Sequence, residues 1–208
     1  MNLDPSTTAP PRGRFESLRR FWSGSASARA MAATEFALIL PLALVVFTGS
    51  LIYGTASEIN RKVTLTARNV TDLVSQYSSL TSADMTTLIN SAAQVMAPFS
   101  TANVTLVITD VTVSNSGQGT VEWSVALSGS GLTTGQSVTN LPTNIQAIPG
   151  VAGQATMHII WGHVAYVYTP TIGYAITQLF GTITLYDDIY LSPRLSADVQ
   201  YPAATTAP

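Results

Sequence analysis

The sequence predicts an α+β protein: a long N-terminal helix that is membrane-spanning in its first half, a second helix, and a mostly antiparallel β-sheet domain. Three observations predict this fold. An uncharged apolar run covers residues 36–53 of the 208-residue chain. Apolar residues then recur every three to four positions as far as Met96, which is the period of one helix face. From Val104 onward the period changes to two, which is the period of a half-buried strand.

The apolar run is long enough to cross a bilayer. As a helix, its 18 residues rise about 27 Å, close to the roughly 30 Å thickness of the hydrocarbon core. Basic residues gather before the run: Arg12, Arg14, Arg19, Arg20 and Arg29. The positive-inside rule then places the N-terminus in the cytoplasm and the bulk of the chain across the membrane. This role accounts for the basic cluster better than nucleic-acid binding does.

A cleaved secretory signal is the alternative for the same run. Gly54-Thr55-Ala56 ends in small residues that suit such a cut. The apolar run is longer than the usual 7–15 residues of a signal peptide, however. We therefore interpret it as a retained helix.

The helix is expected to continue beyond the membrane to about Ser78, with Glu58 and Lys62 as a favourable i, i+4 pair. A second helix is predicted from Ser82, as N-cap, to the residue before Pro98. Its expected apolar face is Met85, Leu88, Ile89, Ala92, Val95 and Met96.

Alternation predicts the strands. A hairpin is expected from residues 104–109 and 121–127, with a turn at 115–119. A short strand at 137–141, a central strand at 155–168 and a last strand at 182–191 are expected to follow. Trp123 and Trp161 fall within strand patterns and are expected in the core.

The chain accordingly divides into four expected regions, which are a disordered basic cytoplasmic leader (1–27), the long helix with its span (28–80), a periplasmic α+β domain (81–195) and a flexible tail (196–208).

Composition argues against catalysis. The chain has no Cys, which excludes disulfides and thiolate metal sites. His158 and His163 are five residues apart in a predicted strand, so they point to opposite faces and do not share a metal. Asp187 and Asp188 also point to opposite faces, where a solvated strand edge is favoured over a calcium ligand. Phosphate loops, zinc motifs and nucleophile elbows do not occur, so we expect no enzyme and no cofactor.

Two residues of the span are unusual. Glu35 lies at its N-terminal end, and a carboxylate costs about 2.5–3.5 kcal/mol at the bilayer centre and less toward the interface. It either reaches the headgroups or pairs with a cation from another subunit. Pro41 removes a hydrogen bond to the carbonyl of Ala37 and bends or loosens the helix.

The stretch from Ser27 to Pro41 resembles the N-terminus of TadE-like and TadG-like pilus assembly proteins, which are pseudopilins of the tight-adherence, Flp-type pilus system. The residues that carry the resemblance are a basic leader, small residues, Glu35-Phe36-Ala37, an aliphatic run and the proline.

The resemblance implies that a prepilin peptidase cuts between Ala30 and Met31, at a processing site formed by Ala30, Met31, Glu35 and Phe36. It further implies that Glu35 pairs with the new α-amine of Met31 on a neighbouring subunit, so that Met31, Glu35 and Pro41 serve in subunit docking. Processed family members have Gly where Ala30 stands, so an unprocessed TadG-like protein stays an alternative. The chain length favours the TadE-like side.

The implied function is that of a minor pseudopilin, single-pass in the inner membrane, with its C-terminal domain in the periplasm or, in the assembled pilus, outside the cell. Its expected partners are other pilins or pseudopilins, the prepilin peptidase, the inner-membrane assembly platform and membrane lipid, with no nucleic acid. One alternative is a non-polymerising, membrane-anchored extracytoplasmic binding module. A weaker one is a secreted β-domain whose N-terminus is removed.

Overall fold

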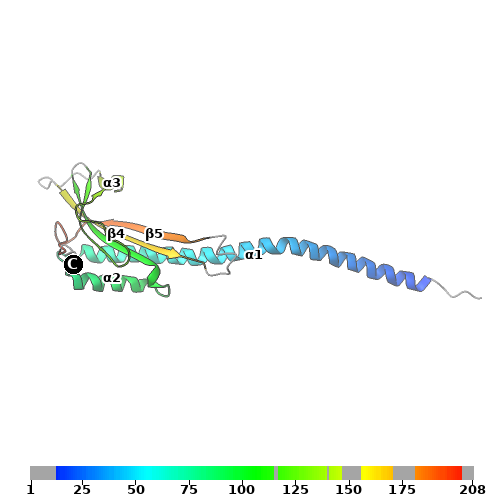
Figure 1. Ribbon diagram of the computed structural model, residues 1–208. Coiled ribbons are helices and arrows are strands. Elements are labelled where there is room, and N and C mark those ends of the chain that lie inside the picture. Colours follow the sequence, from blue (N-terminus) through cyan, green and yellow to red (C-terminus); the bar gives the residue numbers. More distant parts are fainter. Residues whose placement is uncertain (1–12, 115–116, 140, 147–155, 171–180, 203–208) are drawn as a thin grey trace, which may run out of the picture. The chain divides into compact units, whose positions relative to one another are not determined.

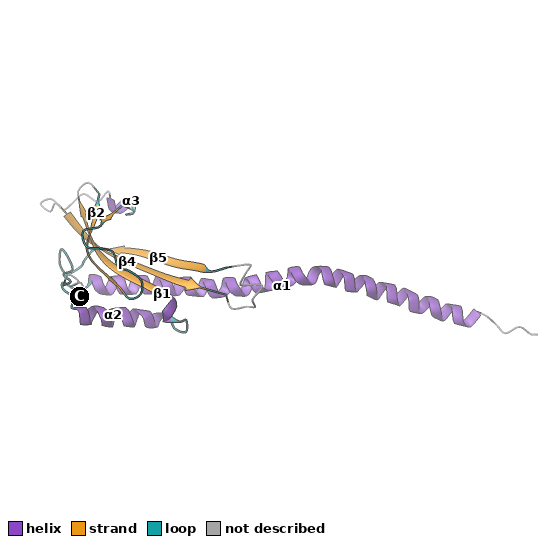
Figure 2. Ribbon diagram, in the orientation of Figure 1, coloured by secondary structure: helices purple, strands orange, loops and turns teal. Residues whose placement is uncertain are grey.

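The structure is a computed structural model that describes residues 13–114, 117–139, 141–146, 156–170 and 181–202. The chain divides into two compact units, Met1–Leu51 and Ile52–Pro208. One helix, α1 (Gly13–Ser75), supplies residues to both units (Figure 1). The second unit adds the remaining helices and all the strands (Figure 2), so the predicted α+β fold is confirmed.

Part of the leader that was expected to be disordered is helical in the structure. Helix α1 begins at Gly13, and residues 13–27 are helical. No proline lies between Pro11 and Pro41, so nothing in the sequence breaks the helix before the apolar run. The first 12 residues of the leader lie outside the described residues.

The sheet of the second unit is antiparallel throughout, with strand order β3-β2-β1-β4-β5. Its strands are β1 (Val104–Ser114), β2 (Gly119–Ala126), β3 (Ser137–Val138), β4 (Thr156–Tyr168) and β5 (Ile183–Leu191). The predicted β1–β2 hairpin is confirmed. The predicted interior position of β4 is also confirmed, since β4 pairs with β1 on one side and with β5 on the other. The predicted third strand is present but only two residues long.

Helix α2 (Ser82–Val95) lies alongside the second half of α1 (Figure 1). Its N-cap is Thr81, one residue before the predicted cap. The Thr81 hydroxyl accepts a hydrogen bond from the Asp84 amide, and the Asp84 carboxylate accepts one from the Thr81 amide. This reciprocal pair needs an acidic residue at the third helical position, which only a cap at Thr81 provides. The predicted apolar face is confirmed, with Met85, Ile89 and Met96 all buried.

The main core lies between these two helices and one face of the sheet, which we call the inner face. It is built from apolar residues of α1, α2, β1 and β4, and its fully buried members include Ile59, Val63, Val70, Met85, Leu106, Ile108, Ile160 and Val164. A smaller cluster covers part of the opposite, outer face, where Val111 and Ile159 pack against Leu141 and against Ile145 of α3 (Thr143–Gln146). A 3₁₀ turn at Thr101–Asn103 leads into β1.

Helix α1 approaches the sheet closely at Gly162 of β4. A Cβ at this position would lie 1.9 Å from Thr71 Oγ1 and 3.2 Å from Thr71 Cβ. Such a separation is shorter than any van der Waals contact, so the crossing of α1 over β4 requires a glycine there.

The segment from Ser196 to Tyr201 is not the flexible tail that was expected. Val199 is 1% exposed and belongs to the main core. The Gln200 amide donates to the Ser78 carbonyl at 3.0 Å, and the Leu80 amide donates to the Gln200 carbonyl at 2.9 Å. An apolar side chain in the core and two backbone hydrogen bonds fix this segment, which a lack of regular periodicity in the sequence concealed.

Lys62 does not form its expected pair with Glu58 among the ion pairs of the described residues. Its Nζ donates to the Ala97 carbonyl, lies 3.4 Å from the Val95 carbonyl oxygen, and lies 5.9 Å from the centre of the Phe99 ring. The last carbonyls of a helix lack intrahelical donors and carry partial negative charge, so they attract a cation. Lys62 therefore caps the C-terminal end of α2.

Candidate functional site

The residues singled out by the sequence lie on α1 in the first unit. Ala30, Met31, Glu35, Phe36 and Pro41 are all exposed, and Met31 and Phe36 are 66% and 64% exposed. Met31 and Glu35 are four residues apart and so share one face of the helix. The structure therefore presents both members of the expected docking pair on the same side of α1.

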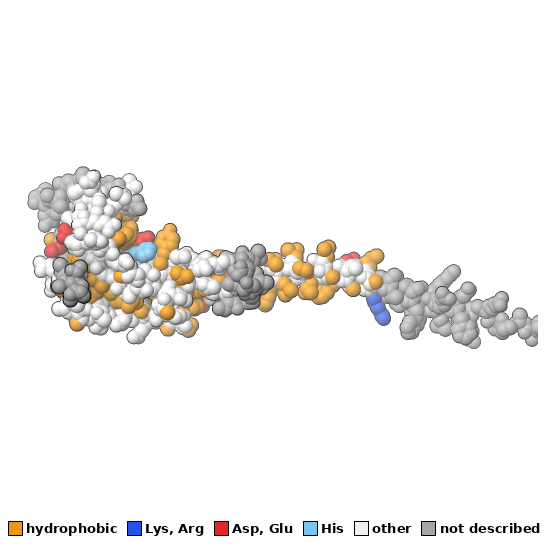
Figure 3. Space-filling view, in the orientation of Figure 1, with side chains coloured by type: hydrophobic (Ala, Val, Ile, Leu, Met, Phe, Trp, Pro, Cys, Tyr) orange, Lys and Arg blue, Asp and Glu red, His pale blue; other side chains and the backbone are white. Residues whose placement is uncertain are grey.

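The apolar residues of this segment are also exposed. They lie on every side of α1 and include Leu38, Ile39, Leu42, Leu44, Val45, Val46 and Phe47. Figure 3 shows hydrophobic side chains along the surface of this part of the helix. Among the described residues, one helical stretch, Ala28–Ser75, is long and apolar enough to cross a membrane, and 11% of its most apolar window is buried. The core helix of a soluble protein would be mostly buried over such a window.

Hydroxyl groups near the span are satisfied within the helix itself. Thr34 Oγ1 donates to the Met31 carbonyl at 2.7 Å, Ser50 Oγ donates to the Phe47 carbonyl at 2.7 Å, and the Thr48 hydroxyl donates to the Leu44 carbonyl. Back-bonding of this kind reduces the cost of placing a hydroxyl in hydrocarbon. Glu35 differs, because it takes part in none of the ion pairs among the described residues.

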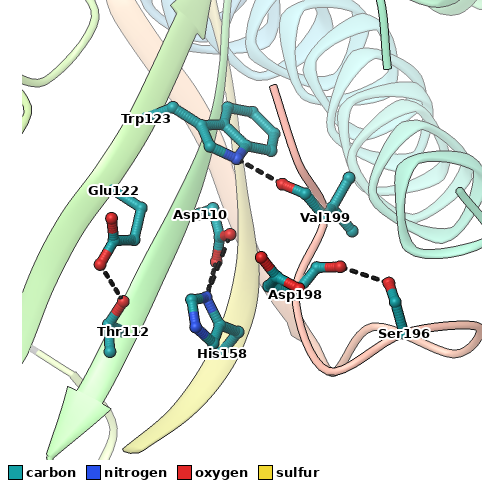
Figure 4. Close-up of polar contacts among 8 residues, drawn as sticks. All are labelled: Asp110, Thr112, Glu122, Trp123, His158, Ser196, Asp198 and Val199. Atoms are coloured by element: carbon teal, nitrogen blue, oxygen red, sulfur yellow. Dashed lines mark hydrogen bonds and ion pairs between the residues drawn. The ribbon is translucent and has the colours of Figure 1, made fainter. Parts of the chain in front are cut away.

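A second group of polar residues lies on the inner face of the sheet, around a buried carboxylate (Figure 4). Asp110 of β1 is 1% exposed, and its two carboxylate oxygens lie 3.2 and 3.3 Å from His158 Nδ1 of β4. Burial raises the pKa of Asp110, and the hydrogen bond from His158 only partly opposes that rise. The hydrogen bond to Asp110 raises the pKa of His158 against the opposing effect of burial.

This inner-face cluster holds the C-terminal segment in place. Trp123 Nε1 donates to the Val199 carbonyl at 2.7 Å, and the Trp123 ring centre lies 5.3 Å from that of Tyr201. The negative charges of Asp198 and Glu122 add to the rise in the pKa of His158. The cluster thus ties β1, β2 and β4 to the C-terminal segment around a buried carboxylate.

A third group lies on the outer face, and the sequence did not reveal it. Asp188 Oδ1 of β5 accepts a hydrogen bond from Trp161 Nε1 at 2.9 Å and lies 2.7 Å from His163 Nδ1, both of β4. The prediction that His158 and His163 point to opposite faces is thus confirmed. The prediction that Trp123 is a core residue is confirmed, and Trp161 is half-buried and packs against the smaller cluster of the outer face rather than in the main core. Asp188 is likewise engaged by two neighbours and is not simply a solvated edge residue.

The spacing of Trp161 and His163, two residues apart in one strand, was the signal that placed them on one face. Asp188 could not be added from the sequence, because its position depends on the register between β4 and β5. Within the described ranges, no three His, Asp or Glu residues converge in a way that could hold a metal ion.

Comparison with known proteins adds no relative. No family model, no curated protein and no solved structure matches the chain.

Proposed function

We propose that the chain is a minor pseudopilin of a tight-adherence pilus. The part of α1 that lies in the first unit anchors it in the inner membrane. One observation carries the proposal: the segment with apolar side chains exposed on every side begins at an acid that joins none of the ion pairs of the described residues, in the order Glu35-Phe36-Ala37 with Pro41 following. The N-terminus lies in the cytoplasm, the second unit lies in the periplasm, and the chain enters the filament or primes its assembly.

Glu35 determines the position along the helix axis at which one subunit docks against its neighbour. An unpaired carboxylate costs up to about 2.5–3.5 kcal/mol within the bilayer, and a cation on a neighbouring subunit offsets that cost. A prepilin peptidase that cuts between Ala30 and Met31 creates this cation as the α-amine of Met31. Docking one position out of register leaves both charges unpaired in hydrocarbon, so only one register is favourable.

Replacement of Glu35 tests the proposal. Glu35→Ala is expected to abolish pili, seen by electron microscopy of the cell surface, while the protein still sediments with the membrane fraction. Glu58→Ala is the matched control, since Glu58 is an exposed acid on the same helix but in the second unit. Normal pili in the Glu35→Ala strain would remove the docking role.

The intact mass of the membrane-bound protein tests processing separately. A mature chain that begins at Met31 is expected. A chain that begins near residue 57 identifies a secretory signal and contradicts the pseudopilin proposal. If the chain is uncut, the proposed α-amine of Met31 does not exist, and Glu35 reaches the lipid headgroups instead of pairing with a neighbouring subunit.

A second candidate function is a membrane-anchored binding module that does not polymerise. The groove and the aromatic row on the outer face of the sheet favour it, because they offer a place for a ligand that does not depend on filament assembly. In that case Glu35→Ala leaves every function of the protein unchanged.

A further inference from the structure

The outer face of the sheet carries a groove with a cavity of about 240 Å³. Its floor is the outer face of β1 from Thr105 to Thr109. One wall is formed by Trp161 and His163 of β4, and the other by Ser130 and Leu132 of the segment after β2. The register agrees with this arrangement, since Trp161 lies opposite Thr109 on the neighbouring strand.

The wall opposite Trp161 is fixed to the sheet by polar contacts. The Leu132 amide donates to Ser124 Oγ at 3.0 Å, and Ser124 Oγ lies 2.9 Å from Thr109 Oγ1. A Cβ at Gly131 would lie 3.2 Å from Ser124 Oγ, so a glycine lets the wall segment approach β2 this closely. The groove is therefore preformed, as ligand sites generally are.

Four rings form a continuous row along the outer face. Tyr190 stacks on Trp161, with ring centres 5.8 Å apart and planes 15° apart. The Trp161 and His163 ring centres are 6.5 Å apart, and those of His163 and Tyr186 are 6.1 Å apart. Tyr186 at the end of the row is 63% exposed. Figure 3 shows a histidine beside acidic and exposed hydrophobic side chains at the surface of this unit. Because Tyr190 covers one face of Trp161, the row offers an elongated ligand ring edges together with the ring faces that stacking leaves open.

The charges of the groove select against anionic ligands. None of its described lining residues is a Lys or Arg, so none of them holds an anion through a permanent cation. The carboxylate of the row, Asp188, already accepts from Trp161 and His163 through Oδ1. The Tyr190 hydroxyl is neutral at physiological pH, as an ordinary tyrosine is, and burial raises its pKa further, to about 12. The remaining polar groups are hydroxyls and an imidazole, which exchange hydrogen bonds with neutral hydroxyl groups.

We propose that this groove binds a neutral oligosaccharide, with one sugar ring against Trp161 in the cavity and the following rings along the row toward Tyr186. A pyranose has an apolar C–H face that packs on an aromatic ring and equatorial hydroxyls that reach groups at the side. Ser130, Thr105 and His163 provide such groups, while Trp161 provides the flat surface. This site is independent of Glu35 and of filament assembly.

Calorimetric titration of the full chain in lipid nanodiscs tests the proposal. The probes are hexasaccharides of β-1,4-linked glucose, α-1,4-linked glucose and β-1,4-linked N-acetylglucosamine, together with free glucose. At least one hexasaccharide is expected to bind in the millimolar range or tighter, and free glucose about tenfold more weakly. Trp161→Ala is expected to weaken hexasaccharide binding about tenfold, the loss of one well-packed aromatic contact.

Tyr186→Ala is a second test variant in case Trp161→Ala fails to fold. The side chain of Tyr186 is exposed and contributes little to the core, so this variant is expected to fold. It is expected to weaken hexasaccharide binding several-fold and to leave glucose binding unchanged. Tyr77→Ala is the matched control, an exposed tyrosine at the end of the α1 region, and is expected to bind as the wild type does. The proposal is overturned if no hexasaccharide binds, if Tyr186→Ala and Tyr77→Ala behave alike, or if tetramethylammonium binds in place of sugar, which identifies an aromatic cation site.

Discussion

Two isoleucines of helix α1, Ile39 and Ile59, lie twenty residues apart in opposite environments. Ile39 in the first unit is 60% exposed, whereas Ile59 in the second unit is fully buried. Both lie in the same uninterrupted helix, Gly13–Ser75, so secondary structure does not distinguish them. What distinguishes them is the pattern of their neighbours along the sequence.

Around Ile39 the helix is apolar on every side, which suits a hydrocarbon solvent. Around Ile59 the apolar residues return every three to four positions and are separated by polar residues such as Asn60 and Arg61, which suits a helix with one face on a core. One helix therefore joins an exposed apolar stretch, long and apolar enough to cross a membrane, to a stretch with one face on a protein core, and the change falls near the boundary between the units.

The largest expected effect comes from truncating these two isoleucines. Ile59→Ala is expected to lower the free energy of unfolding of the second unit by about 2–5 kcal/mol, because it removes buried methyl groups and leaves a cavity. Ile39→Ala is the matched control and is expected to leave that free energy unchanged. Urea denaturation followed by tryptophan fluorescence measures both. Equal destabilisation by the two variants would contradict the division of α1 into two environments.

A smaller effect is expected at the crossing of α1 and β4. Gly162→Ala is expected to cost about 1–3 kcal/mol, since its Cβ collides with Thr71. Gly54→Ala is the control on the exposed part of α1, where no atom lies within 4 Å of the added Cβ. Adding Thr71→Ala removes the closest atom and is expected to restore part of the stability lost in Gly162→Ala. If the Gly162→Ala and Gly54→Ala proteins have the same melting temperature, α1 does not approach β4 as closely as described.

The smallest effect is expected from pH. Asp110 raises the pKa of His158, so the folded state binds this proton more tightly than the unfolded state does. The resulting stabilisation is complete below pH 6.5, the ordinary histidine pKa, and is lost as pH rises through the raised pKa. The raised pKa of Asp110 acts in the same direction, with loss beginning above 3.8.

Denaturation curves from pH 6 to 8 should therefore show the free energy of unfolding of the wild type falling relative to that of His158→Gln. Asp110→Asn, which removes the charge that raises the histidine pKa, is expected to flatten the same slope. A wild-type slope identical to that of His158→Gln would mean that the pair does not couple to folding.

Much of the fold could be predicted from the sequence because its signals are local. The three-to-four spacing from Ile59 to Val74 predicted a buried helix stripe, and the alternation from Val104 predicted the first strand. The errors fell where a distant segment decides. Trp161 was expected in the core, but the main core covers the other face of its strand, and Trp161 packs against the smaller outer cluster instead. Val199 has no periodic neighbours, yet it is buried in the main core.

The candidate sites divide in the same way. The sequence by itself determined the apolar segment, the position of Glu35 within it and the opposite orientation of His158 and His163, because each depends on spacing within one element. Only the tertiary structure decided that Asp110 lies buried against His158, and that Asp188 joins Trp161 and His163 beside a groove. Those partners lie 25 to 48 residues apart in the chain, and strand order and register bring them together. Because the residue period of a strand is two, only the pairing of neighbouring strands determines which of their alternating side chains meet.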